Sequence, residues 1–273
     1  MKQIIVLLYV IVPLALAAQS NKTNTRICGT EFSRFGLSGL SYSAALDAAG
    51  KMHNDYQEYV LRFLLKNKAN FSDTVLLKKI IFEKTNEFFI QRGFTPDKRL
   101  YVLNLGKAYQ PTFGMLPQQY SVEAYALLIE LQNAVSSYSE LNEVSFFNSL
   151  QSIRNRALSL KDDKEVFIVG IPVSIAIQSF QYWKTQGQYW IDQLTALPFK
   201  AMVVGETAER KPCKVKLLNA GVADAGGALT GASSGLVLGP GGALAGGVMA
   251  GATSSLGNIT NQVISCHISW WPF

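Results

Sequence analysis

Apolar side chains recur three and four positions apart through most of residues 41–200. This spacing predicts amphipathic helices, because residues three and four apart share one face of an α-helix. Serines near the starts of these segments are suited to cap helix N-termini. The predicted fold class is therefore mainly α, with a helical bundle body. We expect its first helices over residues 43–66, 72–93, 121–137 and 139–160.

The apolar and aromatic stretch from 166 to 197 is ambiguous at its start. Ile171-Pro172-Val173 fits either a buried strand or the first turn of a helix, where proline is tolerated. We expect a helix that begins near Pro172. Trp183 and Trp190 then belong to its buried face, and core packing is a commoner role for such residues than ligand display.

Small residues occupy every fourth position from 223 to 255. On a helix these positions stack on one face and leave a shallow groove, in which another helix can approach backbone to backbone. The pattern therefore predicts closely packed helices. The positions of this small-residue stripe are Ala223, Gly227, Gly231, Gly235, Gly239, Ala243, Gly247, Gly251 and Ser255.

The sequence Gly239-Pro240-Gly241-Gly242 interrupts this segment and predicts a turn. It divides residues 219–259 into two arms of about 20 and 18 residues, each about 30 Å long as a helix and so close to one hydrocarbon thickness. We expect a glycine-zipper helical hairpin. Because glycine costs about 1 kcal/mol relative to alanine inside a helix, the arms must pack on each other, on the body or on a second copy.

Apolar and charged residues of this hairpin have opposite effects on its insertion into a membrane. Strongly apolar residues such as Val222 and Leu229 favour it by about 0.3 to 0.6 kcal/mol each, and Asp224, the one formal charge in residues 219–259, opposes it. Asp224 lies near the start of the first arm, so we expect its carboxylate to reach the membrane interface.

The segment from Ala223-Asp224-Ala225-Gly226-Gly227 through Gly239-Pro240-Gly241-Gly242 to Ser254-Ser255 resembles the glycine zippers of class II bacteriocin-like peptides. The resemblance covers about forty residues. The body is similar to that of exported bacterial proteins with a helical body and a glycine-rich tail. In the peptide families such helices pair in a target membrane and permeabilise it. The resemblance thus implies a membrane-active segment at Gly227, Gly231, Gly235, Gly239, Gly247 and Gly251.

The first eighteen residues combine Lys2 with an apolar run and a small-residue Ala15-Leu16-Ala17 stretch. They predict a cleaved secretory signal, with an uncleaved anchor as the alternative. We therefore expect an exported protein of the periplasm, cell envelope or medium, associated with a membrane or free of one. Residues 19–40 lack periodicity and are expected to be a flexible mature N-terminus.

Charge and aromatic residues add two candidate membrane contacts. The net charge of +6 is modest and no arginine-rich run appears, so nucleic-acid binding is not expected. In the basic linker 201–218, Lys214 and Lys216 are suited either to anionic lipid headgroups or to a solvated loop. In the aromatic tail 260–273, Trp270 and Trp271 fit a membrane interface or packing on the body.

Three cysteines allow one disulfide and leave one thiol. A bridge from Cys28 to Cys266 would join the termini, whereas Cys213 with Cys266 would enclose the glycine-rich segment. The sequence does not choose between them.

The sequence contains few candidate catalytic residues. His53 and His267 are the two histidines, and motifs for a nucleophile elbow, a phosphate loop or a zinc helix are absent from the sequence. We expect His53 to be a surface residue or a hydrogen-bonded structural residue. We do not expect Cys266 and the adjacent His267 to form a catalytic pair. The chain is thus predicted to be no enzyme and to need no cofactor or metal.

Two functional hypotheses remain. In the first, the hairpin over 219–259 interacts with a lipid bilayer or with a second copy of itself, in a bacteriocin-like manner. In the second, the protein is a soluble envelope or extracellular binding protein, and the hairpin packs within its own fold over the body at 41–200.

Overall fold

The chain forms a bundle of α-helices, described here from a computed structural model. The structure describes residues 26–27, 37–67, 74–93, 119–139, 142–196, 216–235 and 239–267. Within them the predicted mainly α fold is confirmed. The helices are α2 (Tyr42–Lys66), α3 (Thr74–Ile90), α4 (Val122–Ser136), α5 (Glu143–Ala157), α6 (Asp163–Thr195), α7 (Leu217–Gly235) and α8 (Pro240–His267).

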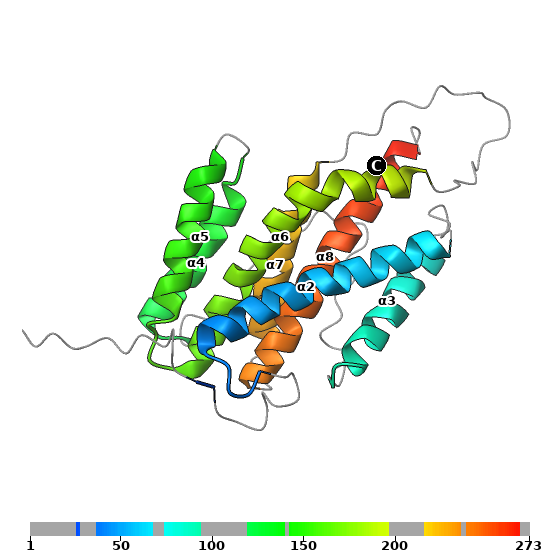
Figure 1. The fold of residues 1–273 in the computed structure, drawn as a ribbon. Helices are drawn as coiled ribbons and strands as arrows, with labels where there is room; N and C mark the ends of the chain where they lie inside the picture. The colour runs from blue at the N-terminus through cyan, green and yellow to red at the C-terminus, as the bar shows by residue number, and fades with distance from the viewer. Residues whose placement is uncertain are drawn as a thin grey trace, which may run out of the picture.

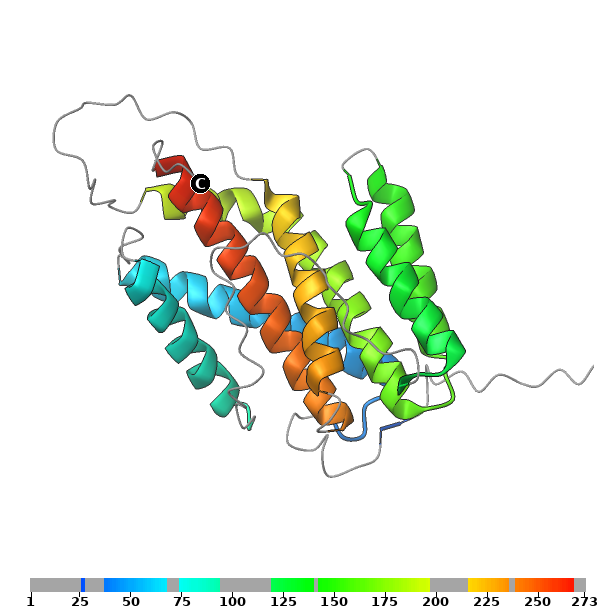
Figure 2. The same ribbon diagram turned by 180° about the vertical axis from the view of Figure 1, so that it is seen from behind.

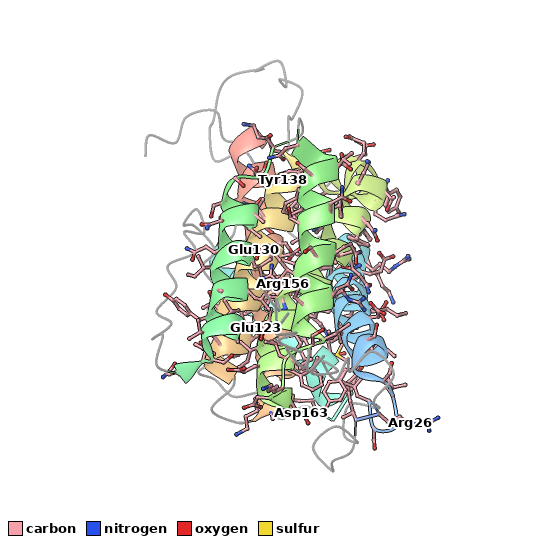
Figure 3. All side chains as sticks on the ribbon, turned by 90° about the vertical axis from the view of Figure 1, so that its left-hand side faces the viewer. Arg26, Glu123, Glu130, Tyr138, Arg156 and Asp163 are labelled. Carbon is pink, nitrogen blue, oxygen red and sulfur yellow. The ribbon has the colours of Figure 1, made fainter. Side chains whose placement is uncertain are left out.

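The long helix α6 and the α7–α8 hairpin form the centre of the bundle (Figure 1). Helix α2 crosses one side of this group, and the view from behind shows α7 and α8 side by side on the other (Figure 2). Helices α4 and α5 pair next to α6, and α3 packs beside α2. An ion pair of 2.6 Å between Glu130 and Arg156 joins α4 to α5 (Figure 3).

Capping side chains explain where several helices begin. Ser41 and Ser121 each accept a hydrogen bond of 3.2 Å from the backbone N–H three residues later, so α2 and α4 start close to their predicted positions. The fourth predicted helix starts at Glu143 rather than at residue 139. Asn142 is the reason, because its side chain accepts from the Ser139 N–H at 2.8 Å and donates to the carbonyl of Ser137 at 2.9 Å, closing a turn instead.

Helix α6 begins at Asp163, so the prediction of a start near Pro172 was wrong. Asp162 caps the helix by accepting from the Lys164 N–H at 2.8 Å, and Pro172 lies inside the helix. The first half of α6 is buried on all sides, including Val166, Ile171 and Ile177. A helix apolar on every face has no periodicity to reveal its start, which is why proline was the stronger signal in the sequence.

Trp183 and Trp190 are buried, which confirms their predicted place in the core. Helix α6 also has the length and apolar composition of a membrane-crossing helix, and within the described residues it alone does. Most of that apolar window, 83%, is buried inside the fold. The buried core helix of a globular protein can have the same length and apolar composition, so these properties by themselves do not make α6 a membrane helix.

Residues near the start of the described chain also join the core. Ile27 and Leu37 are buried within the segment 19–40, for which the sequence predicted flexibility. The N–H of Ile27 donates to the Leu40 carbonyl at 2.8 Å, next to the cap of α2. These two residues therefore close the bundle at the start of α2.

Several predicted features lie outside the described residues. They are the signal at 1–18, most of the basic linker at 201–218, the side chains of Cys266 and His267, and Cys28, Cys213, Lys214, Trp270 and Trp271. Helix α8 runs to His267, so the first residues of the predicted tail at 260–273 are helical.

Candidate functional site

The two arms of the hairpin meet through their glycines. A Cβ atom placed on Gly231 would lie 2.0 Å from the carbonyl oxygen of Gly246, and one on Gly235 would lie 2.0 Å from that of Gly242. Real Cβ atoms do not approach so closely. The backbones of α7 and α8 are therefore in direct contact, and larger residues at these positions would separate them.

The closest contacts of α8 with α7 lie one residue away from the predicted stripe. The α7 positions Gly227, Gly231 and Gly235 do face α8, but their partners are Gly242, Gly246, Ala250 and Ser254. A count by fours does not carry over from one helix to the other, because α7 ends at Gly235 and α8 begins at Pro240. Gly239 has a φ of +83° and precedes Pro240, so the turn ends where α8 begins and Gly241 and Gly242 are helical.

The predicted α8 positions line a second close contact, beside the first. A Cβ on Gly247 would lie 2.8 Å from Cγ2 of Ile171 on α6, and one on Gly251 would lie 3.2 Å from Cδ2 of His53 on α2. Ala223, Ala243 and Ser255 are buried as well. Gly247 and Gly251 also approach α7, at the carbonyl oxygens of Ala228 (3.3 Å) and Asp224 (3.1 Å), so the predicted stripe on α8 lies between α7 and the body.

A cluster of polar side chains lies buried where α2, α6, α7 and α8 meet. Its centre is the carboxylate of Asp224, which has 0% exposure. We call this group the Asp224 cluster. Its members are His53 and Gln57 on α2, Ser179 and Trp183 on α6, Asp224 on α7 and Ser255 on α8.

Asp224 accepts hydrogen bonds from two neighbouring helices. On α2, Nε2 of Gln57 lies 3.0 Å from each carboxylate oxygen, and Nε2 of His53 lies 3.0 Å from Oδ1. On α6, Nε1 of Trp183 donates to Oδ2 at 2.9 Å and the hydroxyl of Ser179 donates to the same oxygen. A buried carboxylate needs such donors, because its desolvation would otherwise cost several kcal/mol.

Both ring nitrogens of His53 face oxygen acceptors. Nε2 faces Asp224, and Nδ1 lies 3.0 Å from Oδ1 of Asn54. The Asn54 amide is held in that orientation because its Nδ2 donates to the Gln178 carbonyl at 3.2 Å. Nε2 of Gln57 also lies 3.1 Å from Nε2 of His53, so the imidazole contacts Gln57, Asn54 and Asp224 together.

Gln57 links Asp224 to the last helix. Its Nε2 lies 2.7 Å from the hydroxyl of Ser255 on α8, in addition to its contacts with the carboxylate. The Oε1 atom of Gln57 is buried without a hydrogen-bond partner. Turning the amide over would place Oε1 against the carboxylate, so donation to Asp224 fixes the amide with one acceptor unsatisfied.

The arrangement does not place a serine beside a histidine base. Ser179 and His53 both contact the carboxylate of Asp224, so the acid lies between them, whereas a catalytic triad places the histidine in the middle. All three side chains are buried. Within the described part of the chain, no three His, Cys, Asp or Glu residues gather as a metal site would require. The cluster can hold four helices together, and this is the role its geometry supports.

Asp224 itself differs from its prediction. The sequence placed its carboxylate at a membrane interface, but the structure places it inside the bundle, bonded to α2 and α6. Its partners were not anticipated. One signal could have found them, because His53 with Gln57 and Ser179 with Trp183 are polar pairs four residues apart on otherwise apolar helix faces.

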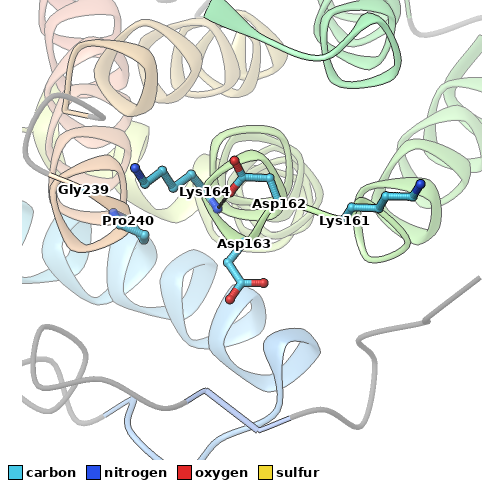
Figure 4. Close-up of a pocket in the computed structure, with 6 residues that line it drawn as sticks. All are labelled: Lys161, Asp162, Asp163, Lys164, Gly239 and Pro240. Carbon is cyan, nitrogen blue, oxygen red and sulfur yellow. Dashed lines mark hydrogen bonds between the residues drawn. The ribbon is translucent and has the colours of Figure 1, made fainter.

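A shallow surface depression lies where α6 and α8 begin, lined by Lys161, Asp162, Asp163, Lys164, Gly239 and Pro240. Figure 4 shows Lys164 extending toward Gly239 and Lys161 pointing away from it. Two lysines and two aspartates give it no net charge, and Asp162 already caps α6. The depression therefore lacks a convergent set of groups for one ligand.

Of the predicted lipid-contacting residues, Lys216 is within the described part of the chain. Its side chain is exposed, and its backbone N–H donates to Oε1 of Gln262 at 2.7 Å, which joins the start of α7 to α8.

Comparison with protein-family models, with curated proteins and with solved structures gave no match.

Proposed function

We propose that the protein is an exported, membrane-active protein that stores its glycine-rich hairpin inside a closed helical bundle. The main support for this proposal is that the segment 219–259, with one formal charge in 41 residues, is also among the most buried parts of the fold. In the closed form, α2 and α6 cover this segment. In the active form, the hairpin leaves them and enters a lipid bilayer, as the bacteriocin-like peptides that it resembles do.

The packing within the hairpin supports its transfer as one unit. Helices α7 and α8 contact each other more extensively than either contacts the body, and the contact between them is backbone to backbone. Small-residue contacts of this kind also hold helices together in lipid, because they depend on close packing and not on exclusion of water. The hairpin can therefore keep its internal contact while it exchanges the body for lipid.

The contacts with the body are of a different kind. Gly247 and Gly251 approach Ile171 and His53, and Asp224 bonds to side chains on α2 and α6. These contacts are lost when the hairpin leaves. Their apolar part is replaced by lipid, so the polar bonds of Asp224 are the main interactions that the bilayer does not replace.

A specific observation also favours the second hypothesis, a soluble envelope or extracellular binding protein. The glycine positions Gly227, Gly231, Gly235, Gly247 and Gly251 all contact other parts of the same chain. A hairpin whose grooves are filled in this way serves as a core without opening. This function predicts that the closed bundle binds its partner and never inserts.

Two disulfide staples would distinguish these functions. Gly247→Cys with Ile171→Cys would join α8 to α6, because a Cβ at 247 lies 2.8 Å from Cγ2 of Ile171. Gly251→Cys with Ala228→Cys would join α8 to α7, because their β-carbons would lie 3.2 Å apart. The second pair is near the separation of about 3.5 to 4.5 Å that disulfides adopt between β-carbons, and in the first pair a Cβ at 247 contacts the Ile171 side chain directly.

Dye release from anionic liposomes is the measurement, together with co-flotation of the protein. The staple to α6 should reduce release by about tenfold or more, since the hairpin cannot leave the bundle, and a reducing agent should restore it. The α7–α8 staple is the matched control, and its oxidised and reduced forms should release dye equally, because both carry the same cysteine at 251 beside His53. Equal release by both oxidised staples, or no flotation of the unstapled chain, would contradict insertion of the hairpin as a unit.

A further inference from the structure

We propose that the Asp224 cluster is an autoinhibitory latch that sets how readily the hairpin leaves the bundle. This inference rests on the proposed membrane function and adds the contact that regulates it. Asp224 is the single charge of the hairpin, and the four side chains that directly contact its carboxylate belong to the body. Opening the bundle therefore breaks all of these contacts at once.

In the closed form the latch favours the bundle. The carboxylate receives donors from two helices that are far apart in sequence, α2 through His53 and Gln57 and α6 through Ser179 and Trp183. Each of these donors is itself buried, so loss of the carboxylate would leave a donor without an acceptor. The body and the hairpin thus satisfy each other's buried polar groups.

In the open form the same residue opposes insertion. The first arm begins at Leu217, which places Asp224 about two helical turns inside it. A carboxylate at that depth has to be brought to the membrane surface or neutralised before the arm can span the hydrocarbon. One residue therefore lowers the free energy of the closed form and raises that of the inserted form. Both effects favour the closed form.

A role in stability alone predicts something different. Any destabilising substitution would then loosen the bundle to the same extent as a substitution at Asp224. The latch predicts instead that residue 224 changes membrane activity beyond its effect on stability, because it also acts in the inserted state. A comparison at equal stability separates these two accounts.

The test uses Asp224→Asn in the full chain. Asparagine keeps the shape but removes the charge, and it presents an amide N–H₂ to groups that are already donors. Dye release from anionic liposomes should increase about tenfold over the wild type, since both states shift in favour of insertion. Ser179→Ala retains the charge and removes one donor, so it should increase release by about threefold.

Leu127→Ala is the control for stability. Leu127 is buried on α4, away from the cluster, and its truncation weakens the core without changing the charge of the hairpin. Release by this variant should stay within about twofold of the wild type at a denaturation midpoint similar to that of Asp224→Asn. An increase equal to that of Asp224→Asn would overturn the latch.

Hydrogen exchange of residues 219–259 without lipid provides a second readout. The latch requires faster exchange in Asp224→Asn and in Ser179→Ala than in Leu127→Ala. Faster exchange without any dye release by any variant would overturn the membrane function and keep the closing contact. Dye release by the wild type that Asp224→Asn leaves unchanged would overturn the latch and keep the membrane function.

Discussion

Gly231 on α7 and Gly246 on α8 occupy each other's side-chain space. A Cβ atom on Gly231 would lie 2.0 Å from the carbonyl oxygen of Gly246, and one on Gly246 would lie 2.1 Å from that of Gly231. The obstacle is backbone on both sides, so no rotation of a side chain can relieve the overlap. The distance between the two arms is therefore set by the absence of both β-carbons.

Substitution of either glycine by alanine should destabilise the protein. Alanine gains about 1 kcal/mol in helix propensity. The overlap requires the arms to separate along their contact, and overpacking of this kind costs about 1 to 3 kcal/mol or more. We expect Gly231→Ala and Gly246→Ala to lower the free energy of unfolding in a denaturant titration.

Ser234→Ala is the matched control, because Ser234 is exposed on the same helix. Its free energy of unfolding should change by less than about 0.5 kcal/mol. A gain in stability from Gly231→Ala would show that α7 and α8 do not meet at this distance.

Trp183 and Trp190 should differ in what their indole nitrogens contribute. Nε1 of Trp183 donates to the carboxylate of Asp224 at 2.9 Å, whereas Nε1 of Trp190 donates to the neutral hydroxyl of Tyr182 at 2.7 Å. Hydrogen bonds to charged groups contribute about 1.5 to 3 kcal/mol and neutral ones about 0.5 to 1.5 kcal/mol. Trp183→Phe should therefore lower the free energy of urea unfolding by about 1 kcal/mol more than Trp190→Phe does. The reverse order would argue against the hydrogen bond from Trp183 to Asp224.

Arg154 should contribute more to stability than its neighbour Arg156. Arg154 on α5 has a side-chain exposure of 14% and donates to Asp47 at 2.7 Å and to the hydroxyl of Ser43 at 3.0 Å, both on α2. Arg156 has 47% exposure and pairs with Glu130. Lysine cannot reproduce the several bonds of a guanidinium, so Arg154→Lys should cost about 1 to 2 kcal/mol.

Arg156→Lys should cost less than about 0.5 kcal/mol, because an exposed ion pair is largely screened by solvent. Thermal unfolding of the two variants at one salt concentration makes the comparison. Equal costs would mean that α5 does not dock on α2 through Arg154.

Tyr59 should make the fold sensitive to alkaline pH. Burial, with a hydrogen bond of 2.5 Å to Oε1 of Glu87, raises the pKa of Tyr59 from 10.0 to about 12. Burial also raises the pKa of Tyr182, which donates to Glu58. A pKa raised by folding gives stability that is complete below the unfolded value and is lost as pH rises through the folded value.

The wild type should therefore lose stability more steeply than Tyr59→Phe between pH 10 and about 12. Unfolding midpoints at a series of alkaline pH values test this. The ultraviolet absorbance of tyrosinate should also show one late-titrating group fewer in Tyr59→Phe. Identical pH profiles for the two proteins would remove Tyr59 as the cause.

The helical fold could be predicted because most of its helices have one apolar and one polar face. Helix α2 is an example, since its periodicity and Ser41 together locate it to within about two residues. The start of helix α6 was harder to predict, because its apolar residues face every side and leave no periodicity to mark a boundary. The rule that proline begins a helix then outweighed the cap at Asp162.

The small-residue pattern indicated close helix packing but not which faces meet. The stripe was counted as one series, whereas it covers two helices, α7 ending at Gly235 and α8 beginning at Pro240, whose registers are independent. Close contacts also occur where no repeat exists, as at Gly50 on α2, where a Cβ would lie 2.9 Å from the carbonyl oxygen of Ser174 on α6. Such contacts depend on how the helices cross, which periodicity does not describe.

The convergence of the Asp224 cluster was not predicted, for a related reason. Polar pairs four residues apart mark single helix faces, and the cluster exists because four helices converge on one point. The pairing of Asp224 with His53 and Gln57 depends on contacts between segments more than 160 residues apart, such as the 167 residues between Gln57 and Asp224.

This separation has a consequence for synthesis. Gln57 bonds to Asp224 and to Ser255, which follow it by 167 and 198 residues. Helix α2, which ends at Lys66, is therefore made long before α7 begins at Leu217, whereas α6 ends at Thr195, shortly before α7. Chains dominated by such distant contacts fold slowly. Closure of this bundle should be a late event, completed after translation has passed Ser255.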